Sequence, residues 1–423
     1  MYKSAHVLTA LAVASGAALA QQTAPPTVTV YGIVDAGVNY VSGMASNETQ
    51  LVSGIMEGSR FGLRGNEDLG GGYRALFTVE HRLEVNNGTF SSRPLSGLQT
   101  PDRLNQAALL GLPAALQPAV SAVAAGIAQQ RLGVNVDSTP ARFWDRQAYV
   151  GLVTPYGAIL LGRQYTPAYE ISGTFDTLGT QSSLTAGQVI SVPAGIDIRV
   201  SNALQYRIVL GGLTASAMYS FGDPGTVSGN SKANRFGGAM VMYKAGPYAA
   251  GIGYNQRNND LGQESLRSTM VGASAQVGPG TISALYGDIK DDNPSGVSTI
   301  ATTLTPVTGA AGAALVQAAF TEALKQDGRL MHIGYKWPMG NNTLYLAYTS
   351  YDDKRSANAD VASYGVAYTY ALSKRTDINV VLAHFDNKNL AQVAPGQAGF
   401  FGGFTESAGT DANNVALGIR HRF

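Results

Sequence analysis

The sequence contains no cysteine, and only 13% of its 423 residues are charged. The absence of cysteine excludes a disulfide framework and any thiolate-bound metal. Soluble domains usually carry roughly 25% charged residues, about twice this fraction. Beyond the N-terminus, no stretch is long and apolar enough to predict a transmembrane helix. These absences disfavour both a disulfide-stapled domain and a helical membrane protein.

An excess of either charge is also missing. The chain has 29 Lys and Arg residues against 28 Asp and Glu residues, a formal net charge of +1. A balanced chain offers no broad basic field to attract a polyanion, so we expect no nucleic-acid partner. The acidic pairs Asp291-Asp292 and Asp352-Asp353 lack the spacing of a calcium loop, so solvated loop charge is the better interpretation. We expect neither a metal nor a cofactor.

Signatures of catalysis are lacking as well. A hydrolase needs a nucleophile beside a base. The five histidines show no recognisable serine or acid constellation around them, and no G-x-S-x-G elbow occurs in the chain. We therefore expect no enzymatic activity.

The chain does have an export signal at its start. Lys3 precedes an apolar run over residues 5–19, and Ala-Leu-Ala stands at 18–20. This is the arrangement of a secretory signal with an A-x-A-like cleavage site. We predict a signal peptide over residues 1–20, cut after Ala20, and a single domain over residues 21–423. Abundant glycine (51 residues) and tyrosine (21 residues) suit a β protein of an envelope membrane.

A two-residue alternation dominates the rest of the chain, and residues 59–83 show it clearly. Phe61 and Leu63 alternate with Arg60 and Arg64, a glycine cluster reverses the chain, and the returning strand alternates in the same way. A soluble sheet would turn its charged face to water and its apolar face to a core. A membrane barrel instead places the charged face in a wet lumen and the apolar face in lipid. The local pattern leaves both possibilities open.

Sixteen segments of this kind are predicted as strands, at residues 28–40, 58–68, 72–85, 143–153, 158–165, 201–210, 213–221, 234–244, 248–256, 267–277, 281–290, 328–337, 343–352, 361–372, 377–386 and 413–423. Short and long connections alternate along the chain, as an antiparallel membrane barrel requires. An even count brings the first and last strands to the same rim, where they can pair and close the sheet. We predict an all-β fold, a 16-stranded antiparallel transmembrane β-barrel with short periplasmic turns and long extracellular loops, wide enough for an aqueous channel.

Two alanine-rich stretches, residues 105–133 and 308–328, break the alternation. Alanine favours helices, whereas Pro113 and Pro118 are expected to interrupt the first stretch. Both stretches fall in long-loop positions. We predict surface helices, one of them covering an apolar stripe against the barrel mouth or a neighbouring subunit.

Several segments together resemble the general porins of the Gram-negative outer membrane, and the β-proteobacterial branch in particular. They are VTVYGIVDAGVNY (28–40), SRFGLRGNEDLGGGYRALFTVE (59–80), RQAYVGL (146–152), LGRQYTPAY (161–169) and the ending GIRHRF. The similarity extends over the mature chain, which the two alanine-rich stretches make longer than a typical member. The resemblance implies a multi-pass outer-membrane porin in contact with lipid, a homotrimer whose water-filled channels pass ions and small hydrophilic solutes by passive diffusion.

The resemblance also implies where the channel narrows. In the family, the third long loop folds into the lumen; here it would span residues 165–199 and carry Glu170, Asp176 and Asp197. The family sets a ladder of basic residues on the opposite wall, and the motifs match Arg60, Arg163 and Arg199 to it. Four further arginines have the parity of the wet face and extend the ladder: Arg64, Arg74, Arg82 and Arg146. Pairing of Arg74 and Arg82 with lumen acids such as Glu80 is the alternative for those two.

Two opposed rows of fixed charge would create a field across a narrow wet gap. Rings of arginine favour anions and rings of acids favour cations, and arginine stays charged at any working pH. At least three arginines face two or three acids, so we expect a weak to moderate anion preference. A substrate-specific channel narrowed by the extra helices is the alternative, and a secreted β protein or adhesin is the more remote one.

The last residue has its own expected role. In the family, a terminal phenylalanine with apolar residues at alternate positions before it is read by the outer-membrane assembly machinery. Phe423, Ile419, Leu417 and Val415 fit this signal, and His421 departs from it.

Overall fold

The computed structural model describes residues 27–46, 48–133, 142–180, 182–189, 195–222, 230–396 and 402–423. The predicted signal peptide, residues 1–20 with the cleavage site after Ala20, lies outside these ranges.

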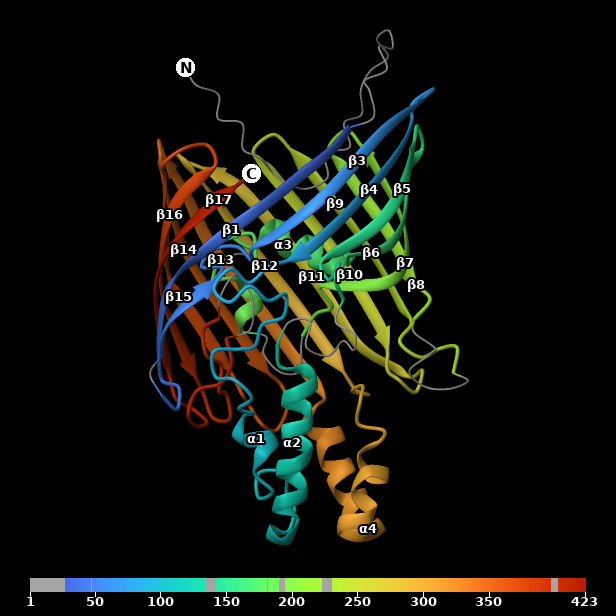
Figure 1. Ribbon diagram of the computed structural model, residues 1–423, viewed down its shortest axis with the longest axis vertical. Helices are drawn as coiled ribbons and strands as arrows, with labels where there is room; N and C mark the ends of the chain where they lie inside the picture. Colours follow the sequence, from blue (N-terminus) through green and yellow to red (C-terminus); the bar gives the residue numbers. More distant parts are fainter. Residues whose placement is uncertain are drawn as a thin grey trace.

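The described chain forms a closed antiparallel β-barrel (Figure 1). Consecutive strands from β3 to β17 pair with one another, and β17 pairs with β1 to close the cylinder. The strands are β1 (Thr27–Ser42), β2 (Glu48–Ser53), β3 (Arg60–Gly70), β4 (Tyr73–Arg82), β5 (Gln147–Thr154), β6 (Gly157–Tyr165), β7 (Arg199–Leu210), β8 (Leu213–Ser220), β9 (Phe236–Ala245), β10 (Tyr248–Asn258), β11 (Glu264–Val277), β12 (Gly280–Asp291), β13 (Gln326–Met339), β14 (Asn342–Asp353), β15 (Val361–Ala371), β16 (Thr376–Asn387) and β17 (Ala412–Arg422).

Strands β2 and β3 share one position in the wall, because β3 pairs with the first half of β1 and β2 with its second half. The wall therefore has sixteen positions, and the predicted 16-stranded antiparallel barrel is confirmed. Between β2 and β3 the chain turns into the barrel. The backbone N–H groups of Ile55, Met56 and Glu57 donate to the Asp35 carboxylate at 2.8, 3.0 and 2.8 Å. This inward segment separates β2 from β3, and sequence analysis missed β2.

The two faces of the wall differ as lipid and water require. On β17, Val415, Leu417 and Ile419 point outward and are 49%, 55% and 53% exposed, whereas Ala416 and Arg420 point inward and are buried. The same alternation runs around the cylinder, so that the apolar side chains have no protein layer over them. A soluble sheet would bury this face in a core. The arrangement is that of a membrane barrel.

Short turns gather at one rim and long loops at the other. The turn between β3 and β4 contains Gly70, Gly71 and Gly72 with φ of 82°, 61° and 82°, a conformation that side chains other than glycine rarely adopt. Phe423 lies at the short-turn rim (Figure 1), and its backbone N–H and C=O each pair with Gly32 at 3.1 Å. The first and last strands thus meet there, as predicted.

The helices lie in the long loops. They are α1 (Asp102–Asn105), the 3-10 turn η1 (Ala114–Leu116), α2 (Gln117–Arg131), α3 (Pro167–Phe175), the 3-10 turn η2 (Ala186–Gln188) and α4 (Ile300–Ala323). Figure 1 shows α1, α2 and α4 beyond the loop rim and α3 within the barrel. Helices α2 and α4 bury a shared apolar core that includes Val120, Ala124, Val316 and Phe320. We refer to α1, η1, α2 and α4 as the helical tip.

The helical tip differs from the predicted insertions at 105–133 and 308–328. Pro118 lies in the first turn of α2 instead of interrupting it, because the N–H groups of the first turn have no intrahelical partner to lose. Helix α4 begins at Ile300, is kinked at Gly309 (φ 71°), and ends before β13 begins at Gln326. By length and composition α4 could cross a membrane. Its apolar stripe instead packs on α2. At the end of α2, Ala128 and Leu132 pack with Phe404 of the loop between β16 and β17, and the alternative contact with a neighbouring subunit stays a prediction.

The segment between β6 and β7, predicted as the constriction loop at 165–199, lies against the inner wall. Helix α3 packs on β9 to β12, where several inward positions are glycine. A Cβ at Gly251 would come 2.8 Å from Ile171 Cδ1, and one at Gly253 would come 2.7 Å from the Pro167 carbonyl oxygen. One at Gly272 would overlap the Phe175 ring. The inner wall beneath the loop is therefore dry and apolar, unlike the wet face that alternation predicts.

Beyond α3, the loop crosses to the other side of the barrel. The Thr177 N–H donates to His332 Nε2 on β13 at 3.1 Å. Further along, the Ser182 N–H donates to the Met56 carbonyl at 2.9 Å, and the Ser183 hydroxyl contacts Asn414 Oδ1 on β17 at 2.7 Å. These contacts fix the loop across the lumen and leave a cavity that residues of β1, β3 to β7, β9 to β14 and β17 line.

Candidate functional site

A cavity of about 1930 Å³ extends through the barrel from residues of the helical tip to residues of the short-turn rim. Twelve basic side chains line it: Arg60, Arg64, Arg74, Arg131, Arg146, Arg199, Arg207, Lys244, Arg257, Lys336, Arg420 and Arg422. Six carboxylates do so as well: Glu57, Glu80, Glu170, Asp176, Asp197 and Asp291. The lining thus carries twice as many cationic as anionic side chains.

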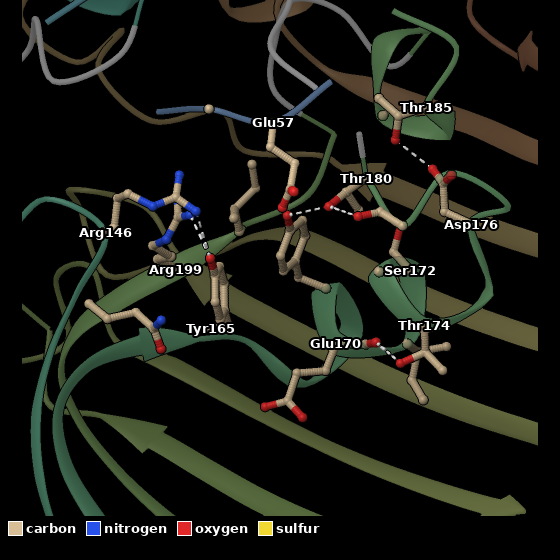
Figure 2. A pocket seen from close by; sticks show the side chains of 18 of the residues that line it. Glu57, Arg146, Tyr165, Glu170, Ser172, Thr174, Asp176, Thr180, Thr185 and Arg199 are labelled. Carbon is tan, nitrogen blue, oxygen red and sulfur yellow. Dashed lines mark hydrogen bonds between the residues drawn. The ribbon is translucent and has the colours of Figure 1, made fainter. Parts of the chain in front are cut away.

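An arginine cluster lines the cavity around Tyr165, at the end of β6 and beside the constriction loop. Nη2 of Arg146 and Nη2 of Arg199 donate to the Tyr165 hydroxyl at 3.2 and 3.0 Å. Figure 2 shows the two guanidinium groups converging on this hydroxyl. The Arg146 Nε lies 2.7 Å from Glu80 Oε1, and the Arg60 Nε lies 3.9 Å from Glu80 Oε2. Two cations, Arg146 and Arg60, therefore share the Glu80 carboxylate, and Arg199 joins the cluster through the Tyr165 hydroxyl.

A second carboxylate, Glu57, joins this cluster to the C-terminal strand. Its Oε1 lies 2.6 Å from Arg60 Nη2, and its Oε2 lies 2.9 Å from Arg420 Nη1 and 3.3 Å from Arg422 Nη2. Burial acts to raise the pKa of Glu57, but Arg60, Arg420 and Arg422 outweigh it and hold the pKa below its ordinary value. Glu57 is therefore a fixed anion in a surplus of positive charge. The inward segment between β2 and β3 puts it there.

The acids predicted on the constriction loop do not face the arginine cluster. Glu170 Oε2 pairs with Arg207 Nη1 on β7 at 2.6 Å, and Asp197 Oδ2 lies 3.3 Å from Arg257 Nε on β10. Asp176 is nearly buried and accepts the N–H groups of Leu178 and Ala186 at 2.8 and 2.7 Å. In Figure 2, Glu170 points away from the arginines and Asp176 toward Thr185. The simple picture of two opposed charge rows is therefore wrong.

Five of the seven predicted ladder arginines line the cavity: Arg60, Arg64, Arg74, Arg146 and Arg199. Arg82 and Arg163 do not. Arg82 is 1% exposed, with Nη1 3.2 Å from Glu84 Oε1 and Nε 3.5 Å from Asp145 Oδ2. The alternative of ion pairing therefore holds for Arg82, whereas no ion pair of Arg74 is found among the described residues.

Arg163 is a correction to the motif-based ladder. Its Nε donates to the Asp145 carbonyl at 2.6 Å and its Nη1 contacts Ser201 Oγ at 2.9 Å. The register of β6 against β7 shifts between Gly162 and Gln164. The extra residue lies on β7, and Arg163 keeps the parity of Ile159 and Leu161, which are exposed on the outer face. Arg163 therefore braces the wall beside the lumen.

Sequence analysis did not assign several cations to the lining: Arg131, Arg207, Lys244, Arg257, Lys336, Arg420 and Arg422. Arg420 and Arg422 share the face opposite Val415 and Leu417 by alternation, and parity along β7 and β13 carries the same signal for Arg207 and Lys336. The tyrosines of the lumen, Tyr31, Tyr165 and Tyr345, carry no such signal because tyrosine occurs on both faces of the wall.

The histidines take structural positions. His332 accepts the Thr177 N–H through Nε2, and its Nδ1 contacts Thr349 Oγ1 at 2.8 Å. Within the described ranges, no three histidine or acidic side chains gather in a way that could hold a metal ion.

Comparison with known proteins agrees with the barrel and its lumen. The model of the Gram-negative porin family matches residues 7–390. Outer membrane porin protein 32 of Delftia acidovorans is 26% identical over the full length of both chains. An outer membrane porin protein of Bordetella pertussis is 24% identical over 98% of this chain and 99% of its own.

Solved structures share the fold. The structure described as an anion-selective porin from Comamonas acidovorans superposes with a TM-score of 0.67 at 22% identity, covering 94% of this chain and all of its own. The trimer form of OmpT from Vibrio cholerae superposes with a TM-score of 0.55 at 14% identity, covering 94% of this chain and 99% of its own. The barrel, its inside-out faces and the match over most of the chain place this protein in the outer membrane, and the chain belongs to the Gram-negative porin family.

Proposed function

We propose that the channel passes small hydrophilic solutes by passive diffusion and prefers anions. The observation that carries this proposal is the composition of the lining, with twelve basic side chains against six carboxylates. A surplus of fixed cations raises the local concentration of anions and lowers that of cations in a narrow wet passage. The structural relative described as an anion-selective porin supports the same direction.

The position of the surplus strengthens the proposal. Arg60, Arg146 and Arg199 surround one carboxylate, Glu80, where the constriction loop narrows the lumen. Two of the three loop acids have a cation partner, Glu170 with Arg207 and Asp197 with Arg257, and Asp176 is buried among hydrogen-bond donors. A permeating cation therefore meets no uncompensated row of acids at this level.

The proposal extends to assembly. A homotrimer is consistent with the trimer form described for the Vibrio cholerae relative. Phe423 ends β17 with an exposed ring, 47% accessible, on the outward parity of Ile419 and Leu417, and this exposure suits recognition by the outer-membrane assembly machinery. Catalysis forms no part of the proposed function.

Reversal potentials across a planar bilayer separating unequal KCl solutions test the preference. We expect a reversal potential with the sign that shows chloride permeating faster than potassium. The chloride-to-potassium permeability ratio should fall as the salt concentration rises, because screening shortens the reach of the fixed charges. Clear potassium selectivity would overturn the proposal.

A further inference from the structure

The cations that line the lumen fall into classes by what holds them. Six lie within 4.0 Å of a carboxylate: Arg60, Arg146, Arg207, Arg257, Arg420 and Arg422. In the described part of the chain, five have no ion pair: Arg64, Arg74, Arg199, Lys244 and Lys336. The remaining one, Arg131, donates to the Ser295 carbonyl at the loop rim. A carboxylate partner offsets most of a cation's field, so the five differ from the six in what a passing ion experiences.

Three of the five lie over a tyrosine ring. The Arg199 guanidinium carbon is 4.5 Å from the centre of the Tyr165 ring. The corresponding distance from Arg64 to Tyr31 is 5.3 Å, and Lys336 Nζ lies 5.5 Å from the Tyr345 ring. All three distances are within the ~6 Å range of a cation–π interaction.

Strand register builds these contacts into the wall. Tyr165 is directly opposite Arg199 across β6 and β7, and Tyr345 is directly opposite Lys336 across β13 and β14. Tyr31 is opposite Gly62, which makes Arg64 its diagonal neighbour on β3. Directly opposed side chains lie about 5 Å apart at Cβ, and diagonal neighbours remain within reach of long side chains. The contacts therefore follow from the hydrogen-bonded sheet itself.

The tyrosines are themselves held in place. The Tyr165 ring stacks on Tyr169 of α3 with 5.1 Å between ring centres. The Tyr31 hydroxyl donates to Glu80 Oε2 at 3.1 Å. A fixed ring limits the positions of the cation above it, but it carries no net charge. A tyrosine can thus immobilise a cation and leave its full charge to a passing anion, which a carboxylate cannot do.

We propose that Arg199, Arg64 and Lys336 are the stations that set anion passage, each positioned by its tyrosine. This inference rests on the anion preference proposed above. Arg199 begins β7 beside the constriction loop, Arg64 lies midway along β3, and Lys336 lies near the end of β13 at the short-turn rim. At ~3.3 Å per residue along tilted strands, successive stations are about 10 Å apart along the axis. That spacing is close to the Debye length in physiological salt, about 8 Å, so each station acts locally and an anion moves from one to the next.

The experiment compares chloride-to-potassium permeability ratios of single variants. Arg199→Gln, Arg64→Gln and Lys336→Gln should each lower the ratio about two-fold, and the triple variant should abolish the preference. The matched control is Arg329→Gln, which removes one cation from the outward face of the same strand as Lys336. It should leave the ratio unchanged.

Variants of the ring test its role separately from the charge. Tyr345→Leu keeps Lys336 but removes the ring, and should lower the ratio by part of the Lys336→Gln effect. Tyr345→Phe keeps the ring and should behave as the native protein. A ratio in Tyr345→Leu equal to the native one would overturn the role of the tyrosine.

The outcomes separate this inference from the general proposal. A native channel without anion preference would overturn the proposed function itself. The native channel could prefer anions while all three glutamine variants have the same permeability ratio as Arg329→Gln. That result would overturn only the role of the three stations. If a glutamine variant inserts poorly, the dependence of conductance on KCl concentration in dilute solutions is the second measurement. Because chloride is held at the stations, native conductance should saturate with concentration, and this saturation should be lost in Lys336→Met. A native conductance that rises linearly with concentration would contradict the inference.

Discussion

Phe175 of α3 lies directly over Gly272 of β11, at a distance that leaves no room for a Cβ on the glycine. The close approach holds the constriction loop on the inner wall. We predict that Gly272→Leu displaces α3 toward the open side of the lumen, because the new side chain must occupy the space of the Phe175 ring. Single-channel conductance should fall or split into several levels.

The control for this prediction is Gly237 on β9, where an added Cβ meets nothing within 4 Å. Gly237→Leu should conduct as the native channel does. Native conductance in Gly272→Leu, with its barrel intact by heat-dependent gel mobility, would show that the loop does not depend on this contact.

Arg146 and Arg163 provide a second test, since both belong to the predicted ladder and only Arg146 lines the lumen. Arg146→Gln should lower the chloride-to-potassium permeability ratio by up to about two-fold, because Glu80 loses its 2.7 Å partner and its negative charge is then less compensated. Arg163→Gln should leave the ratio unchanged and reduce stability by about 1–3 kcal/mol through lost charged hydrogen bonds. Reversal potentials and thermal unfolding in detergent measure the two effects. A changed ratio in Arg163→Gln would contradict its placement beside the lumen.

The sequence predicted the wall of the barrel well because every wall strand alternates and most are bounded by turn residues. All sixteen predicted segments coincide with strands. β2 was missed because its boundary is set by tertiary contacts: the carboxylate of Asp35 captures three N–H groups of the inward segment. Nothing in the local composition of residues 48–59 indicates that a remote acid will draw the backbone out of the sheet.

The lumen was predictable only as far as parity holds. Arg60, Arg64 and Arg74 lie where their alternation places them, on uninterrupted parts of β3 and β4. Arg163 was assigned from its motif alone, and alternation along β6 gives it the parity of Ile159 and Leu161, which are 42% and 50% exposed on the outer face. The partners of the loop acids were equally inaccessible, since Glu170 meets Arg207 only through the path that α3 takes along the wall.

Glu57 gives a prediction for pH. Its pKa is lowered from 4.5 by Arg60, Arg420 and Arg422, against the opposing effect of burial. Glu57→Gln should increase anion preference at pH 7 because it removes one fixed anion from the cavity lining, while Arg420 and Arg422 keep their second partner, Asp377. The native channel should approach the variant only at a pH well below 4.5, where Glu57 takes up its proton.

The same shift has a consequence for stability. A carboxylate whose folded pKa is below its unfolded pKa stabilises the fold at higher pH, and this contribution is lost as pH falls through the folded value. Native protein should therefore lose thermal stability below about pH 4.5 more steeply than Glu57→Gln does, as heat denaturation across a pH series would show. Parallel losses in the two proteins would mean that the three arginines do not stabilise Glu57.

The helical tip should be an energetically separate unit. Phe320 is fully buried between α2 and α4, whereas Leu315 on the same helix is 51% exposed. Phe320→Ala should destabilise the tip by about 3–5 kcal/mol, through lost burial and the cavity left behind, and Leu315→Ala should change it by less than about 0.5 kcal/mol. Because the core of the tip contains no residue of the barrel strands, amide hydrogen exchange should rise in α2 and α4 of Phe320→Ala while the strands keep native protection. Increased exchange across the strands would show instead that the tip and the barrel unfold together.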